Sequence, residues 1–248
     1  MELTLQLGII VFAVEFICFF IKGLAAFGDP LISNPALSLF IDNRVISPMN
    51  LILQAPLNGW ISWKNRKSFS IKKSLLMLIC IFCGIIPGVL LLKYAASWIL
   101  KAVLGILVLG IGLEMITRNR AKPSGENRII MALVSFCSGI TAGLYGINLF
   151  FVAYVERTTK DRAAFRGSVC FIFFIENVAR TILYIVTGIF TRYILLLSLI
   201  ALPGMIAGFI LGSRVDKKLS EAVIRRIIIT MFMLGGISIL LKSLIWRT

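Results

Sequence analysis

Residues 22–35, KGLAAFGDPLISNP, interrupt an apolar run with helix-breaking residues and a pair of charges. Gly23, Gly28 and Pro30 each disfavour a continuous helix here. A helix that breaks inside a membrane leaves backbone N–H and C=O groups unpaired, so a break is tolerated only where protein buries it or where it lines a cavity. The stretch therefore predicts a broken membrane helix at a place enclosed by protein.

A second interruption follows in residues 139–154, GITAGLYGINLFFVAY. A shift of 118 residues places Phe27-Gly28 on Tyr145-Gly146. The same shift places Pro30-Leu31 on Asn148-Leu149. Paired interruptions at corresponding places in two halves of a chain are typical of a transporter's substrate site.

The composition indicates an integral membrane protein. Of the 248 residues 59% are hydrophobic, and the mean hydropathy is +0.97, which is more apolar surface than soluble domains of this size bury. The net charge of +15 does not indicate a nucleic-acid partner, because the basic residues lie in short loops between apolar segments. The chain has no His, which excludes His-dependent catalysis and most zinc sites. We expect no enzyme activity, no metal and no cofactor.

The cysteines are interpreted as packing residues. All five lie in apolar segments: Cys18, Cys80, Cys83, Cys137 and Cys170. Redox or metal chemistry requires thiolates, which apolar surroundings oppose. The amino terminus carries the acidic Glu2 and the first apolar run leads into the first break, so we do not interpret that run as a removable signal peptide.

Length and charge predict the topology. Six further apolar segments of 19 to 21 residues match the length that crosses a bilayer: 45–63, 74–92, 98–116, 167–187, 193–211 and 224–244. Four loops carry 18 of the 26 Lys and Arg residues: 64–73, 118–128, 156–166 and 212–226. Because basic residues stay on the cytoplasmic side, these four loops are predicted to be cytoplasmic.

Each broken stretch is too short for two full crossings. Residues 129–155 have a cytoplasmic loop at each end, and 27 residues at about 1.5 Å per residue cannot cross twice. We expect this segment to enter, break near residues 143–146 and turn back. The same count of membrane crossings between cytoplasmic loops makes residues 5–41 a hairpin entered from outside. Both termini are therefore predicted to lie outside.

The predicted fold is therefore all-α and polytopic, with two inverted repeats. Each repeat has one broken, re-entrant helical hairpin and three transmembrane helices. The first repeat covers residues 1–117, a cytoplasmic linker covers 118–128, and the second repeat covers 129–248. Ile86-Pro87-Gly88 and Leu202-Pro203-Gly204 occupy corresponding segments, which favours the duplication.

At the two breaks the chain resembles the sulfite exporter TauE/SafE family, over essentially its whole length. The family carries two copies of a glycine-rich break, roughly G-x-G-G-G followed by an apolar run. The matching stretches here are GLAAFGDPL at 23–31 and AGLYGINL at 142–149, and DRAAFR at 161–166 also looks familial. The triple glycine is reduced to Gly28-Asp29-Pro30 and to Gly146-Ile147-Asn148.

The resemblance implies export of small sulfur-containing anions, such as sulfite or organosulfonates, across a bacterial inner membrane. The substrate would then be a small anion held at the breaks. Because the glycine motifs are degenerate, they specify the family better than the substrate.

The residues around the breaks are the candidate binding residues. A half-helix that begins after Gly28 would present N–H groups and a positive dipole to an anion, and two inverted repeats would bring two such ends together near the midplane. Asn148 adds an amide donor. Phe27, Tyr145 and Gly146 complete this candidate set. The alternative is that the glycines form plain hairpin turns, with Asp29 capping a helix.

Three charges near the first break have several interpretations. Asp29 repels an anion, so it is interpreted as a helix cap, a partner of Lys22 or a proton carrier. Lys22 lies seven residues after Glu15 on about the same helix face, so these two also form a candidate pair. Lys22 is either a direct anion contact or half of a structural ion pair, because charges at membrane depth are usually functional or paired.

A second polar cluster lies in residues 167–187 and comprises Glu176, Asn177 and Arg180. Glu176 and Arg180 are four residues apart, so a salt bridge within the helix is expected. Either that bridge only neutralises two buried charges, or Arg180 gives positive potential to an anion pathway. Gln54 and Asn58 are candidates for the related place in the first half.

The sequence thus predicts a secondary transporter that exports a small sulfur-containing anion by alternating access. The alternative is a proton- or cation-coupled carrier or a channel for another small solute, with Asp29 and Glu176 as the ion sites. A receptor or scaffold would not need paired breaks. The oligomeric state and the coupling ion stay open.

Overall fold

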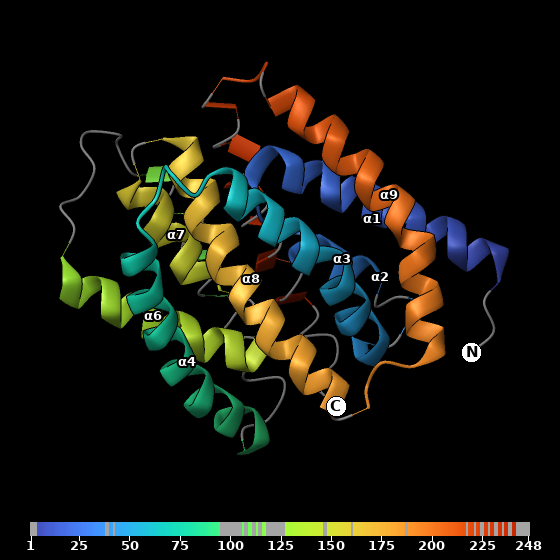
Figure 1. The fold of residues 1–248 in the computed structure, drawn as a ribbon, viewed down its shortest axis with the longest axis horizontal. Coiled ribbons are helices and arrows are strands. Elements are labelled where there is room, and N and C mark those ends of the chain that lie inside the picture. Colours follow the sequence, from blue (N-terminus) through green and yellow to red (C-terminus); the bar gives the residue numbers. More distant parts are fainter. Residues whose placement is uncertain are drawn as a thin grey trace. The chain divides into compact units, whose positions relative to one another are not determined.

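The fold is that of a computed structural model and is entirely helical in the part described (Figure 1). The structure describes residues 4–37, 40–41, 43–94, 127–145, 148–159, 161–186, 188–216 and 218–220, with isolated positions within 106–117 and 222–241. These residues form no strand. Their helices are α1 (Leu5–Ala25), α2 (Asp29–Leu37), α3 (Asn43–Lys64), α4 (Ile71–Tyr94), α6 (Arg128–Tyr145), α7 (Leu149–Thr158), α8 (Arg162–Val186) and α9 (Arg192–Asp216).

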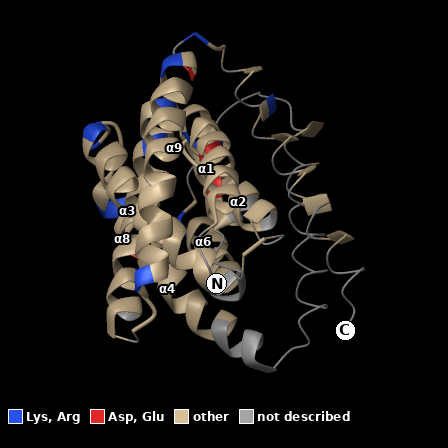
Figure 2. Ribbon diagram, turned by 90° about the vertical axis from the view of Figure 1, so that its right-hand side faces the viewer, with Lys and Arg blue, Asp and Glu red and all other residues tan. Residues whose placement is uncertain are grey.

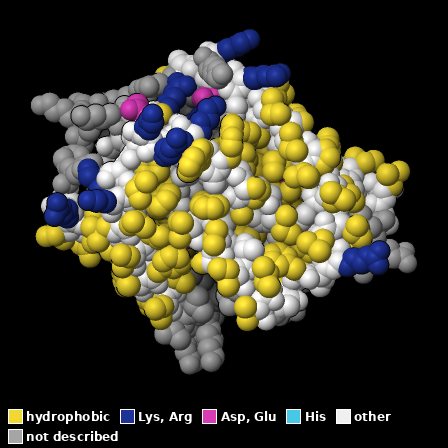
Figure 3. All heavy atoms as spheres, in the orientation of Figure 1, with side chains coloured by type: hydrophobic (Ala, Val, Ile, Leu, Met, Phe, Trp, Pro, Cys, Tyr) yellow, Lys and Arg dark blue, Asp and Glu magenta, His cyan; other side chains and the backbone are white. Residues whose placement is uncertain are grey.

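Four helices are long and apolar enough to cross a membrane, namely α1, α8, α9 and the part of α4 from Ile71 to Gly88. The apolar part of α6 is shorter and ends at Ala142. Many large apolar side chains are exposed on these helices, and hydrophobic atoms cover much of the face drawn in Figure 3. Lys and Arg lie mostly near helix ends (Figure 2). This distribution is that of a multi-pass membrane protein, as predicted.

The predicted span at residues 45–63 is the helix α3, but α3 is not among the four candidate spans. Pro48 and Pro56 lie inside it, and Asn50, Gln54 and Asn58 follow one another at four-residue intervals. This polar stripe lowers the mean hydropathy of the helix. The predicted spans 98–116 and 224–244, and the linker 118–128 up to residue 126, lie outside the described residues apart from isolated positions.

Packing divides the chain into two compact units, each built from separate stretches of the sequence. Unit 1 comprises Met1–Lys64 and Val169–Arg225, and unit 2 comprises Asn65–Ser168 and Arg226–Thr248. Each unit therefore combines residues from both predicted repeats. The inverted symmetry of the repeats and the boundary at 118–128 stay predictions.

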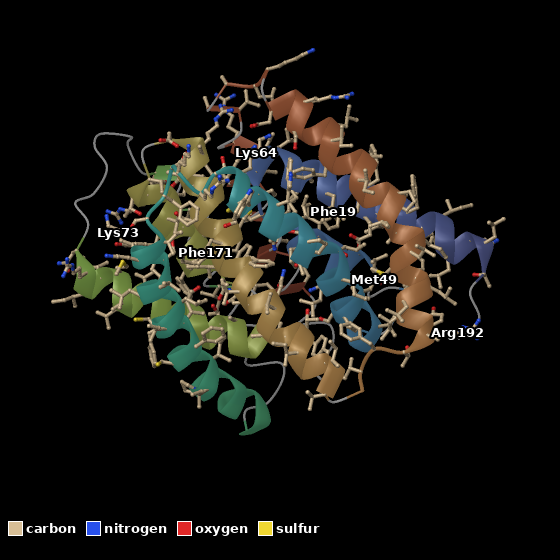
Figure 4. All side chains as sticks on the ribbon, viewed as in Figure 1. Phe19, Met49, Lys64, Lys73, Phe171 and Arg192 are labelled. Atoms are coloured by element: carbon tan, nitrogen blue, oxygen red, sulfur yellow. The ribbon has the colours of Figure 1, made fainter. Side chains whose placement is uncertain are left out.

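In unit 1, α1 lies along α9, and α2 and α3 pack against this pair (Figure 1). The core includes Phe19 of α1 and Met49 of α3, both fully buried (Figure 4). A Cβ at Gly204 would lie 2.7 Å from the carbonyl oxygen of Phe12, and Gly208 is similarly placed on Phe16. From Gly204 to Gly208 of α9, the contacted residue of α1 changes from Phe12 to Phe16. The contacts move toward the carboxyl end of both helices, so α1 and α9 run parallel.

Unit 2 contains a second seam of the same kind, between α4 and α6. A Cβ at Gly84 would meet the carbonyl oxygen of Phe136, and one at Gly88 would meet that of Ile140. These helices also run parallel, because both contacts advance by four residues. In each seam, small residues let two backbones approach closely, which is the usual basis of helix association in lipid.

Candidate functional site

The first predicted break is present between α1 and α2. The last turn of α1 closes at Ala26, which adopts the left-handed conformation at φ 69° and donates its N–H to the carbonyl of Lys22 at 2.7 Å. Gly28 follows at φ 99°, a value that a residue with a Cβ rarely adopts. The helix α2 then begins at Asp29. Ala26, Phe27 and Asp29 are almost fully buried, so protein encloses the break.

Lys22 and Asp29 form an ion pair across this break. The Lys22 Nζ lies 3.0 Å from Asp29 Oδ1, and the two side chains are 1% and 2% exposed. Lys22 also lies over the ring of Phe19, 5.9 Å from its centroid. Of the interpretations of Lys22, the structure shows the pair with Asp29 rather than one with Glu15. The pair ties the end of α1 to the start of α2.

Glu15 belongs instead to a hydrogen-bonded network that joins α1, α2 and α3. The Ser33 hydroxyl donates to Glu15 Oε1 at 2.5 Å, and Asn50 Nδ2 donates to Ser33 Oγ at 2.9 Å. The same Asn50 nitrogen donates to Asn34 Oδ1 at 3.1 Å. Glu15, Ser33 and Asn50 are buried.

Three residues of this network, Ser33, Asn34 and Asn50, are not among the candidate residues predicted from the sequence. A signal was present for Asn50, because it extends the stripe of Gln54 and Asn58 by one turn. Ser33 and Asn34 lie inside the first broken stretch, where a polar pair among apolar residues is a comparable signal.

The second break lies between α6, which ends at Tyr145, and α7, which begins at Leu149. Asn148 is buried at the N-cap of α7, but its side chain does not cap the helix. The Ser138 hydroxyl of α6 accepts the N–H of Phe151 instead, at 3.1 Å, and lies 3.5 Å from Asn148 Oδ1. Gly146 and the side chain of Tyr145 lie outside the described residues.

The contacts that the structure shows at the second break come from neutral side chains, whereas the first break holds an ion pair. This difference agrees with the sequences, since Ile140 and Ile147 stand 118 residues after Lys22 and Asp29. The charged chemistry around the breaks is therefore concentrated in unit 1.

The polar cluster of α8 is partly buried. Glu176 and Asn177 are each 6% exposed, and Arg180 is half-buried. The salt bridge expected from the spacing of Glu176 and Arg180 is not among the ion pairs that the structure shows. Asp161 accepts the N–H of Ala164 at 2.7 Å and thereby caps the start of α8. The helix consequently begins at Arg162, five residues before the predicted span.

The helices α8 and α3 meet at the first break. The Cys170 thiol of α8 donates to the Ala26 carbonyl at 3.6 Å, and both residues share a buried cluster with Ile61 of α3. Close by, Asn58 of α3 is fully buried, and neither atom of its amide has a hydrogen-bond partner in the described part of the chain. The Asn177 Nδ2 likewise has none there.

An all-helical chain with several membrane-crossing helices, and with helix breaks that bury polar and charged side chains, has the construction of a multi-pass membrane transport protein. Comparison with protein-family models matches residues 11–239 to the model described as Sulfite exporter TauE/SafE. The chain therefore belongs to the sulfite exporter TauE/SafE family. Comparisons with curated proteins and with solved structures gave no match.

Proposed function

We propose that this protein is a secondary transporter that exports a small sulfur oxyanion, sulfite or an organosulfonate, by alternating access, with the substrate held at the helix breaks. Membership of the family supports the substrate class. Export of an anion from a cell with a negative interior is downhill, by about 2.3 kcal/mol per charge for each 100 mV. The observation that carries the proposal is a pair of buried amide nitrogens, Asn58 Nδ2 and Asn177 Nδ2, that have no hydrogen-bond partner among the described residues and belong to the two helices that meet at the first break.

Contacts between α3 and α8 place Asn58 and Asn177 within about one helical turn of each other along the two helices. A Cβ at Gly59 would lie 2.9 Å from the ring of Phe174, and Ile61 packs in the cluster that contains Cys170. As α3 proceeds from Gly59 to Ile61, the contacted residue of α8 goes back from Phe174 to Cys170. The two helices are therefore antiparallel. Asn177 follows Phe174 by three residues on about the same face and therefore comes opposite Pro56, within one helical turn of Asn58.

The two carboxamides suit an oxyanion. A buried N–H donor without an acceptor costs about 1–3 kcal/mol, and a sulfonate or sulfite oxygen would remove that cost for both. Amide donors bind an anion without placing a fixed cation in the membrane. Arg180 lies three residues after Asn177 and would add positive potential at this end of α8. Lys22 is already neutralised by Asp29, which makes it a positioning residue in this proposal.

The parallel seams support the proposed topology. The helix α9 leads into the basic loop 212–226, so α1, which runs parallel to α9, also runs toward the cytoplasm. The helix α4 leads away from the basic loop 64–73, so α6 also runs away from the cytoplasm. The two broken hairpins would then be entered from opposite sides, as inverted repeats require.

Sulfite efflux from proteoliposomes under an imposed potential tests this proposal. We expect Asn58→Leu and Asn177→Leu to lose most of the flux, because each removes a donor while nearly preserving volume. Ser198→Ala, which removes a buried hydroxyl of α9 that donates to the Ile194 carbonyl, is the control and should keep the flux. Full flux in both asparagine variants would place the substrate elsewhere, and no flux of any small anion through folded wild-type protein would contradict the function itself.

One observation favours the alternative of a proton-coupled carrier. Two buried carboxylates of unit 1, Glu15 and Asp29, lie around the first break. Of these two, only Asp29 is paired with a cation among the described residues. The excess carboxyl group is that of Glu15.

A further inference from the structure

Glu15 is an acidic residue completely enclosed in the middle of a membrane-crossing helix. Its Oε1 is bound by Ser33, and its Oε2 has no hydrogen-bond partner within the described residues. An ionised carboxylate with one bare oxygen is costly in such a place, because neither water nor a donor solvates the charge. The neutral acid avoids most of that cost.

The charges around Glu15 do not compensate it. On its own helix the only cation is Lys22, which is bound to Asp29 of α2. The other ionisable side chain nearby on α1 is the thiol of Cys18. On α3 and α9, which pack in the same unit, the Lys and Arg residues lie in the first or last turns. Two carboxyl groups therefore share one cation, and the group is neutral only when one carboxyl carries a proton.

The network around Ser33 fits both protonation states of Glu15. With Glu15 ionised, Asn50 Nδ2 donates to Ser33 Oγ at 2.9 Å, and the Ser33 hydroxyl donates to Glu15 Oε1 at 2.5 Å. With a proton on Oε1, Glu15 donates to Ser33 Oγ, and the Ser33 hydroxyl turns to Asn50 Oδ1 at 3.3 Å. In both states Asn50 Nδ2 remains held by Asn34 at 3.1 Å. Rotation of one hydroxyl thus accommodates the arrival or loss of the proton.

We propose that Glu15 is the exchangeable proton site of this carrier. The Ser33 hydroxyl forms a hydrogen bond with Glu15 both when Glu15 is ionised and when it is protonated. The proton comes from bulk water and returns to it, so only the O–H bond of the carboxyl group forms and breaks. The network spans α1 and α2, which the first break joins, and α3, which packs beside that break. Protonation of Glu15 therefore changes hydrogen bonds between elements that have to move if the break opens.

The inference rests on the proposed function for the identity of the anion whose binding the proton affects. Loss of the proton changes the net charge of Glu15, Lys22 and Asp29 from zero to −1, which repels an anion in the same unit. Anion binding and proton uptake should consequently favour each other, by a factor that for coupled sites is roughly 5- to 150-fold. Anion affinity should rise as the pH falls through the titration of Glu15.

The proton site can be tested without any substrate. Infrared difference spectra of the purified protein in lipid nanodiscs, recorded against pH, should show a protonated-carboxyl band that disappears as the pH rises. The band should be absent in Glu15→Gln. In Ser33→Ala its disappearance should shift to higher pH, because the ionised form loses its donor. Asp161→Asn, which removes a carboxylate in the exposed turn before α8, should leave the band unchanged.

A band that never titrates, or one that persists in Glu15→Gln, would overturn the inference. If Glu15→Gln unfolds, Glu15→Asp provides the second variant, and its band should be displaced rather than lost. Binding of methanesulfonate, which stays ionised throughout, then tests the coupling: its affinity should depend on pH in the wild type and not in Glu15→Gln. A titrating Glu15 band in a protein that moves no anion would contradict the exporter function while leaving the proton site standing.

Discussion

At the residue scale, the first break depends on the ion pair of Lys22 and Asp29. The pair is buried among apolar side chains, with Phe19 beside the ammonium group. A buried pair of this kind contributes little net stability, whereas removal of one partner leaves an uncompensated charge. The pair is therefore best understood as a device that fixes the geometry of the break.

Replacement of Lys22 tests this view. We expect Lys22→Met to lower the stability of the protein by about 3–5 kcal/mol, because Asp29 is left buried without a cation. The double variant Lys22→Met with Asp29→Leu should recover most of the loss. Thermal unfolding in detergent, followed by tryptophan fluorescence, measures both. Equal stability of Lys22→Met and the wild type would mean that the Asp29 carboxyl group is neutral or otherwise compensated.

At the scale of elements, the glycine seams bring paired helices into backbone contact. Gly208 lies against the carbonyl of Phe16, and Gly84 against that of Phe136, so neither position has space for a side chain. The two seams use glycines four residues apart on parallel helices, one seam in each unit. This likeness supports a common construction for the two units.

A larger residue should force the α1–α9 seam apart. We expect Gly208→Val to destabilise the protein strongly, because its Cβ would overlap the Phe16 carbonyl and a backbone cannot give way as a side chain does. Gly110→Val is the matched control, since nothing lies within 4 Å of a Cβ built there. The yield of monodisperse protein and the melting temperature are the readouts. A normal melting temperature for Gly208→Val would contradict the close packing of α1 on α9.

At the scale of the whole molecule, we expect the two broken hairpins to be entered from opposite sides of the membrane, from the direction of the helix pair in each unit and the charge of the loops. The parallel course of α1 and α9 depends on tertiary contacts, whereas the cytoplasmic side of loop 212–226 depends on its basic residues. Together they predict an external amino terminus.

Labelling of single cysteines tests this orientation. In a background without the five native cysteines, Thr4→Cys should react with a membrane-impermeant maleimide in intact cells. Ser68→Cys, an exposed position in the basic loop 64–73, should react only after permeabilisation. Both positions labelled from the same side would contradict the topology, since an odd number of crossings is predicted between them.

The sequence by itself determined the membrane class, the all-helical fold, the family, and the first break to within two or three residues. These features depend on local properties: apolar length, glycine and proline in a helix, and basic loops. The local rules also placed Lys22 and Glu15 on one face but could not decide which carboxylate Lys22 binds. That choice depends on where α2 returns after Gly28, which only the fold defines.

Only the tertiary structure decided which distant residues meet. Ser33 and Asn50 join Glu15 because three helices converge, and Ser138 caps α7 because α6 folds back against it. Ile61 and Cys170 meet at Ala26 because α3 and α8 converge on the first break. Such contacts join residues up to 144 positions apart in the chain, and no local pattern encodes them. The physical reason is that burial and helix packing select among partners that the sequence leaves equivalent.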